Sequence, residues 1–213
     1  STIFDMLEAK FISRKILKAY ENWELFIPIV QVSFGINKRI ESNIPVETWI
    51  IKDRSIGKTK TINGYSIMNY CYDRTMAPED KTVIVIRFDS PWELWKDMNG
   101  DLYQNEKDRI EKDAKDILEK RYPGISSSIE VCDVATPLTD VKYTGVWKGS
   151  YEGFMPSSKN LMDNLSPVLP GLKKFYMAGQ WLFPGGGLPP AGQSGKWAIQ
   201  YICKEEGIKF KPC

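Results

Sequence analysis

The hydrophobic period of this chain changes several times, and this pattern narrows the folds that the chain can adopt. Apolar, β-branched runs at residues 26–34, 82–88 and 129–135 are typical of strands. Residues 105–121 instead carry one apolar stripe at helical spacing. That stripe consists of Ile110, Ala114, Ile117 and Leu118. The sequence therefore predicts an α+β fold, with a mixed, largely antiparallel sheet of about five strands covered by helices.

Weaker signals predict the remaining elements of the first 170 residues. We expect residues 3–24 to form a helix with Ser13 as an N-cap, and residues 49–51 to form a short strand. Gly35 is expected to end the first strand. Asn63-Gly64 predicts a hairpin turn, because both positions tolerate positive φ. Residues 136–170 are rich in Pro, Gly, Ser and Asn, which indicates a long ordered loop.

The C-terminal segment has a different pattern, so we predict a boundary between residues 1–170 and 171–213. Here a short strand at 173–178, a glycine-rich turn at 179–187 and a helix at 189–206 are expected in that order. Amides at the start of a helix attract electron-rich groups, and glycines let a ligand approach the backbone. The residues alone fit a ligand-binding turn and a plain turn before a packed helix equally well.

Composition excludes several classes of function. The chain has 213 residues and no histidine, so Ser-His-Asp and Cys-His nucleophile activation are excluded. A catalytic function must then rely on a cofactor or on carboxylates. The 29 basic and 27 acidic residues nearly balance, which argues against nucleic acid as a partner.

The cysteines and the apolar runs suggest a cellular location. Cys71, Cys132, Cys203 and Cys213 form no C-x-x-C pair, so free thiols in a reducing cytoplasm and no metal site are expected. No apolar run approaches the about 20 residues that span a bilayer, and no signal pattern is present. We therefore expect a cytoplasmic protein without a transmembrane segment, and leave peripheral membrane contact open.

Motifs in the C-terminal segment resemble a known family. The run from Phe175 through Gly179-Gln180 and Gly185-Gly186-Gly187 to Trp197 is similar to the C-terminal flavin-contacting signature of the FAD-dependent phytoene desaturase, carotenoid isomerase and retinol saturase group, within the flavin amine oxidase superfamily. Shorter upstream matches follow in the family's order. They are 34–37 (FGIN), 72–78 (YDRTMAP), 122–124 (YPG), 136–139 (TPLT), 143–145 (YTG) and 149–153 (GSYEG).

The resemblance implies a cofactor site for FAD. It places Gly179 and Gln180 near the ribityl-phosphate side of the flavin. The residues that it places against the isoalloxazine end are Gly186, Gly187, Leu188, Pro189 and Ala191. The family's N-terminal G-x-G-x-x-G fingerprint, which holds the pyrophosphate, does not occur in these 213 residues. The resemblance therefore implies the C-terminal half of a flavoenzyme, which alone binds FAD weakly or not at all and is inactive.

By this resemblance, residues 1–170 belong to a substrate-binding domain and residues 171–213 return to an FAD domain. The implied reaction is hydride transfer between flavin and a hydrophobic, polyene or isoprenoid-like substrate, with no catalytic side chain identified. The alternative is a non-catalytic binding module for an apolar ligand or a protein partner. In the first case the strand at 173–178 would lack its neighbours, and this unpaired edge would favour self-association.

Other residues invite functional and structural interpretations. Four tryptophans would line an apolar substrate cavity or, more simply, belong to the core. They are Trp92, Trp95, Trp147 and Trp181. Arg74 and Arg87 are candidates for orienting a carboxylate. Gly57-Lys58-Thr59 resembles the end of a phosphate loop, but Lys52 stands where the first glycine is required, so we expect a hairpin arm.

Overall fold

The computed structural model describes residues 2–51, 54–60 and 64–212. Two compact units emerge from the contacts within the chain. Unit 1 comprises Ser1–Phe26 and Gly145–Cys213, and unit 2 comprises Ile27–Thr144. The boundary predicted near residue 170 falls inside unit 1. The assignment of residues 1–170 and 171–213 to two domains of a parent protein stays a prediction.

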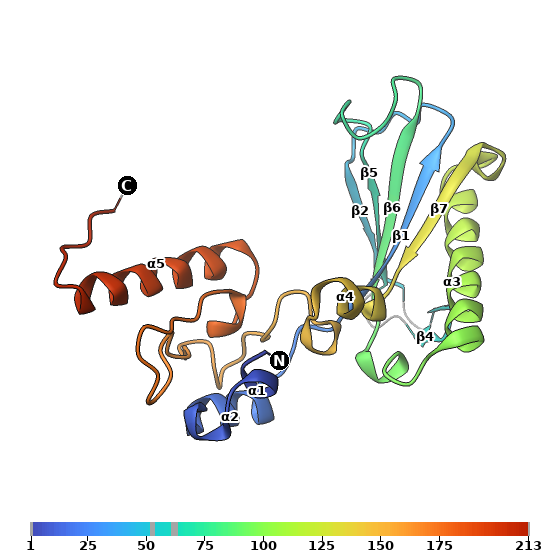
Figure 1. Ribbon diagram of the computed structural model, residues 1–213. Helices are drawn as coiled ribbons and strands as arrows, with labels where there is room; N and C mark the ends of the chain where they lie inside the picture. The colour runs from blue at the N-terminus through green and yellow to red at the C-terminus, as the bar shows by residue number, and fades with distance from the viewer. Residues whose placement is uncertain (1, 52–53, 61–63, 213) are drawn as a thin grey trace. The chain divides into compact units, whose positions relative to one another are not determined.

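Unit 2 is built on a five-stranded sheet (Figure 1). Its strands are β1 (Ile29–Ile36), β2 (Val46–Trp49), β5 (Tyr65–Asn69), β6 (Thr82–Asp89) and β7 (Ile129–Ala135). Their spatial order is β2-β5-β6-β1-β7, and every neighbouring pair is antiparallel. The α+β class and the number of strands are therefore confirmed, whereas no parallel pair joins the described strands.

Helix α3 (Gly100–Arg121) runs alongside this sheet in Figure 1. Its predicted apolar stripe is buried, and alternate residues of β1, from Val30 to Ile36, are buried in the same core. At its C-terminal end Gly124, at φ 85°, leads into the 3-10 helix η3 (Ile125–Ser128). The other face of the sheet carries the partly exposed side chains of Gln31, Ser33 and Met68.

A small hairpin of β3 (Ser55–Ile56) and β4 (Thr59–Lys60) packs against α3. Its turn amides are bound by helix carboxylates: Gly57 N donates to Asp113 Oδ2 at 2.8 Å, and Lys58 N donates to Glu106 Oε1 at 2.5 Å. The hairpin arm expected at Gly57-Lys58-Thr59 is confirmed.

Several boundaries in unit 2 differ from the predictions. Gly35 does not end β1, because β1 continues to Ile36 through a register shift against β7 at Gly35. The strand expected at 49–51 lies earlier, as β2. Asn63 lies outside the described residues, and the expected hairpin arms pair elsewhere, Lys60 with Ser55 and Tyr65 with Trp49.

Short helices follow β6 and β7. After β6, the 3-10 helix η2 (Trp92–Leu94) follows. Helix α4 (Pro137–Thr144) interrupts the loop that we expected at 136–170. Thr136 N donates to Thr139 Oγ1 at 3.0 Å, and Thr139 N donates to Thr136 Oγ1 at 3.4 Å. The TPLT motif therefore caps the N-terminus of α4 through two reciprocal hydrogen bonds.

Unit 1 is largely helical and loop-like. Its elements are α1 (Thr2–Met6), η1 (Ala9–Phe11), α2 (Arg14–Asn22), η4 (Trp147–Gly149), η5 (Gln180–Leu182) and α5 (Leu188–Glu205). Its core is aromatic: Tyr20 lies about 5 Å, centroid to centroid, from Phe4, Trp147 and Phe154.

Two predictions for unit 1 are wrong. The helix expected at 3–24 is broken into three, because Glu8 and Ser13 are extended; Ser13 does cap α2, accepting Ile16 N at 3.3 Å. Residues 173–178 form no strand, since Lys174 has φ 56° and Met177 N donates to Pro167 O in a loop. The edge expected there is absent, and with it the proposed route to self-association.

An ion pair between β2 and α3 gives unit 2 a pH-dependent stability. Arg121 donates to both oxygens of Glu47, at 2.6 and 2.9 Å, and this bonding lowers the pKa of Glu47. Because the pKa of Glu47 is lower in the folded state than in the unfolded state, the ion pair stabilises the fold fully when the pH is above the unfolded-state pKa. This stabilisation is lost as the pH falls through the folded-state pKa.

We expect Glu47→Gln to cost about 1 kcal/mol at pH 7, because the bidentate charge-assisted pair is lost. The difference from the parent chain should shrink when urea unfolding is repeated between about pH 5 and pH 2. A difference that is independent of pH would contradict the assignment.

Candidate functional site

The glycine turn before α5 is held by the side chain of Gln180. Gln180 Nε2 donates to Tyr151 O at 2.7 Å, and Gln180 Oε1 accepts Gly187 N at 3.1 Å. Gly179 N donates to Ser194 Oγ at 2.7 Å, and the buried Ser194 lies on α5. The polar groups of Gln180 and Gly179 thus tie the turn to its surroundings.

Gly186 packs tightly against the backbone of Glu152. A Cβ at this position would lie 1.9 Å from Glu152 O, and the residue has φ 49°. Gly185 N donates to Phe154 O at 3.0 Å. The consecutive glycines at 185–187 all have positive φ, so the shape of the turn explains the run without reference to a ligand.

The start of α5 offers fewer amides than the sequence argument assumed. Pro189 and Pro190 have no N–H, Gly187 N is bound by Gln180, and Ala191 N donates to Gly187 O at 3.2 Å. An anion would therefore find little of the usual helix-start site here. The small number of free amides favours contact with a flat apolar group over contact with a phosphate.

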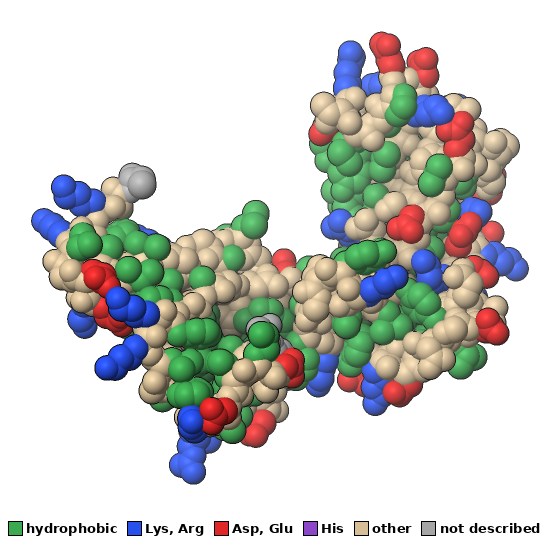
Figure 2. Space-filling view, viewed as in Figure 1, with side chains coloured by type: hydrophobic (Ala, Val, Ile, Leu, Met, Phe, Trp, Pro, Cys, Tyr) green, Lys and Arg blue, Asp and Glu red, His purple; other side chains and the backbone are tan. Residues whose placement is uncertain are grey.

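An apolar stripe on α5 is open. Leu188 is 87% exposed and Ile199 is 50% exposed. Gly192 and Gly195 lie between them on the same side of the helix, and a Cβ on either would meet nothing within 4 Å. Figure 2 shows apolar side chains at the surface in this part of unit 1, with basic residues beside them. A flat group can approach the helix backbone closely along this stripe.

The tryptophans do not line one cavity. Trp95 is 1% exposed in the core of unit 2, where its Nε1 donates to Ser90 Oγ, and Trp92 packs against the same core. Trp147 and Trp181 pack in the aromatic core of unit 1. Each tryptophan thus packs in a core, the simpler interpretation, and Trp147 also lines a pocket of about 340 Å³ beside Phe4 and Leu17.

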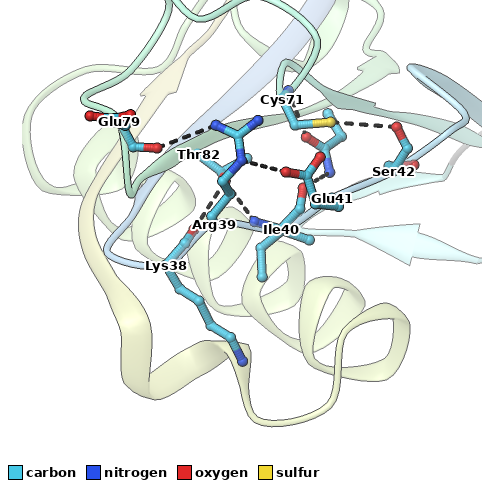
Figure 3. A network of polar contacts seen from close by, with 9 residues as sticks. Lys38, Arg39, Ile40, Glu41, Ser42, Cys71, Glu79 and Thr82 are labelled. Atoms are coloured by element: carbon cyan, nitrogen blue, oxygen red, sulfur yellow. Dashed lines mark hydrogen bonds and ion pairs between the residues drawn. The ribbon is translucent and has the colours of Figure 1, made fainter.

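Unit 2 has a pocket of about 220 Å³ lined by Arg39 and Cys71, and Figure 3 shows the polar contacts of these two residues. Arg39 NH1 donates to Glu79 O at 3.2 Å, and Arg39 Nε donates to Glu41, a contact that raises the pKa of Arg39. Arg74 lines this pocket, whereas Arg87 is on the sheet and donates to Gln31 Oε1. The two arginines proposed as carboxylate ligands are thus not brought together.

The described residues give little support to other chemistry. Burial raises the pKa of the Cys132 thiol to about 12, so this thiol is unreactive near neutral pH. No group of three or more metal-ligating side chains occurs among the described residues. Nor does any helix in the described part of the chain combine the length and apolarity needed to cross a membrane.

Comparison with known proteins identifies relatives of this chain. Prolycopene isomerase of Daucus carota is 31% identical over 144 residues, which cover 65% of this chain and 23% of the relative. The chloroplastic enzyme of the same name from Arabidopsis thaliana is 30% identical over 144 residues, covering 65% and 24%. Prolycopene isomerase 1 of an Oncidium hybrid is 28% identical with the same coverage. No family model matches the chain.

The chain is thus similar to prolycopene isomerases over 144 residues. The predicted resemblance to the carotenoid isomerase group is thereby confirmed. The chain spans about a quarter of the length of the relatives it matches.

Sequence reasoning found the glycine turn but missed the residues that hold it. Tyr151 and Glu152, which contact Gln180 and Gly186, lie in the GSYEG motif about 30 residues earlier. That motif was noticed only as a family match. Its proximity to the turn is a tertiary contact without a periodic signal.

Proposed function

We propose that this chain is part of an FAD-dependent oxidoreductase that acts on a carotenoid or a similar polyene. The identity with prolycopene isomerases carries this proposal. The name of these relatives indicates the substrate class, and we assign the cofactor to the glycine turn. Residues 179–191 would then contact the flavin, and the cytoplasmic location stays a prediction.

The residues of α5 fit a flat ring system. Leu188 and Pro189 are exposed, and Gly192 and Gly195 add no side chain that would keep a ring away from the helix. When bound, a flavin supplies hydride acceptance and donation. The chain's own contribution is to orient the ring by apolar contact, while Gln180 holds the turn through Tyr151 and Gly187.

The uncovered face of the sheet fits the substrate. Met68 and Val46 lie side by side on β5 and β2, and Val131 is 62% exposed on β7. Arg87, Gln31 and Ser33 form a hydrogen-bonded chain across the same face. A long apolar molecule would bury the valine and methionine side chains and exclude water from them.

The test uses the gene product that contains this chain, purified and supplied with a poly-cis carotene. A flavin absorbance spectrum with about one flavin per chain and a change in carotene absorbance would support the proposal. The 213-residue chain alone should retain no flavin. A gene product that binds neither flavin nor carotene would overturn the assignment.

We expect Gly192→Leu to abolish flavin retention by that gene product, because the side chain would occupy the open stripe of α5. Gln193→Leu is the matched control, since it places the same side chain on the next exposed residue, about 100° around the helix. Flavin absorbance at 450 nm is the readout, with circular dichroism as the check on folding. Equal flavin content in the two variants would contradict the assigned stripe.

A further inference from the structure

The edge strand β2 presents an unpaired row of backbone groups. Among the described strands, β2 pairs only with β5. Asn69 N donates to Pro45 O at 2.9 Å, which makes this a hydrogen-bonded pair of the ladder. Because such pairs alternate in antiparallel sheets, residues 47 and 49 also point their amides toward β5. Residues 46, 48 and 50 therefore direct their N–H and C=O groups away from the sheet.

This edge also carries exposed apolar side chains. Val46 is 52% exposed and Ile50 is 82% exposed. Edge strands are usually protected by a charged residue, a proline or a covering element. Here the charge of Glu47 is bound by Arg121, and Pro45 precedes the strand without interrupting residues 46–50. The edge is thus a template for another strand.

The sequence of β2 is complementary to itself in one antiparallel register. With Thr48 opposite Thr48 of a second copy, Val46 lies opposite Ile50, and both are hydrogen-bonding positions on one face of the sheet. Shifting the register by two residues would place Glu47 opposite Glu47, and like charges directly opposite are unfavourable. The register centred on Thr48 avoids this repulsion and places the two exposed apolar residues of the edge, Val46 and Ile50, opposite each other.

We propose that two copies of this chain pair through β2, with the two Thr48 residues facing each other, to form one continuous ten-stranded sheet. The pairing buries Val46 and Ile50 of each copy and satisfies the outward amides of residues 46, 48 and 50. A two-fold axis makes the contact closed, so it gives a dimer and no filament. This surface is independent of the flavin assignment, which concerns unit 1.

Charge substitution at the two-fold axis tests the proposal on the 213-residue chain. Thr48→Lys and Thr48→Glu each place like charges opposite one another, and each should raise the dimer dissociation constant about tenfold. Mixing the two variants places lysine opposite glutamate and should restore the dimer. Sedimentation velocity between about 1 and 200 µM, a range that brackets a micromolar dissociation constant, provides the measurement.

Ser66→Ala is the matched control, because it removes the 3.1 Å contact between Thr48 Oγ1 and Ser66 Oγ without changing the edge. This variant should dimerise like the parent chain. A parent chain that stays monomeric throughout the range would overturn the proposal, and would do so whether or not the edge binds a strand of another protein. Dimers of Thr48→Lys as stable as those of the parent would also overturn it.

Discussion

Replacing Gly186 with alanine is expected to lower the free energy of unfolding of unit 1 by about 2–4 kcal/mol. The new Cβ would lie 1.9 Å from Glu152 O and 2.6 Å from Glu152 C, so two backbone segments must separate. Alanine is also strained at φ 49°. Hydrogen exchange measured by mass spectrometry should show faster exchange across residues 150–190, with unit 2 unchanged.

Gly195→Ala is the control for this prediction. Gly195 lies within α5, and a Cβ there meets nothing within 4 Å, so alanine should stabilise the helix by about 0.5–1 kcal/mol. The two substitutions add the same methyl group to nearby glycines with opposite expected signs. Equal destabilisation by both would mean that the turn is not held against Glu152 as described.

The sequence predicted those helices, strands and caps that are determined by the residues within the element itself. Helix α3 contains the predicted residues because its apolar stripe is set by local helical geometry, and the structure buries that stripe on one face; β7 has the predicted bounds. Ser13 was found for a similar reason, since an N-cap is a contact between residues three positions apart. These signals require no knowledge of the rest of the fold.

Tertiary contacts account for the failures. Residues 173–178 have the composition of a strand, but they pair with no strand in the described part of the chain and follow a loop. The helix-start argument at α5 failed because the partners of Gly187 and Ala191 are set by folding of the turn. The edge expected at residues 173–178 is absent, and the unpaired edge on β2 was not predicted, because the strand order decides where the edges lie.

Removing the buried carboxylate of Glu106 should be the most damaging side-chain substitution in unit 2. The Glu106 side chain is 1% exposed, accepts Lys58 N, and also accepts Arg109 NH1 at 3.2 Å. Glu106→Ala leaves the turn amide of Lys58 without its acceptor and opens a void beside Gly57. We expect a cost of about 2–4 kcal/mol in urea unfolding.

Glu106→Gln separates the hydrogen bond from the charge. Glutamine fills the same volume, and its side-chain oxygen can still accept Lys58 N, so the cost should fall to about 1 kcal/mol. Arg109 is 52% exposed and can be solvated when its partner is neutral, which is why the lost ion pair contributes little. If glutamine costs as much as alanine, the negative charge itself stabilises the β3–β4 turn, and the amide contact is secondary.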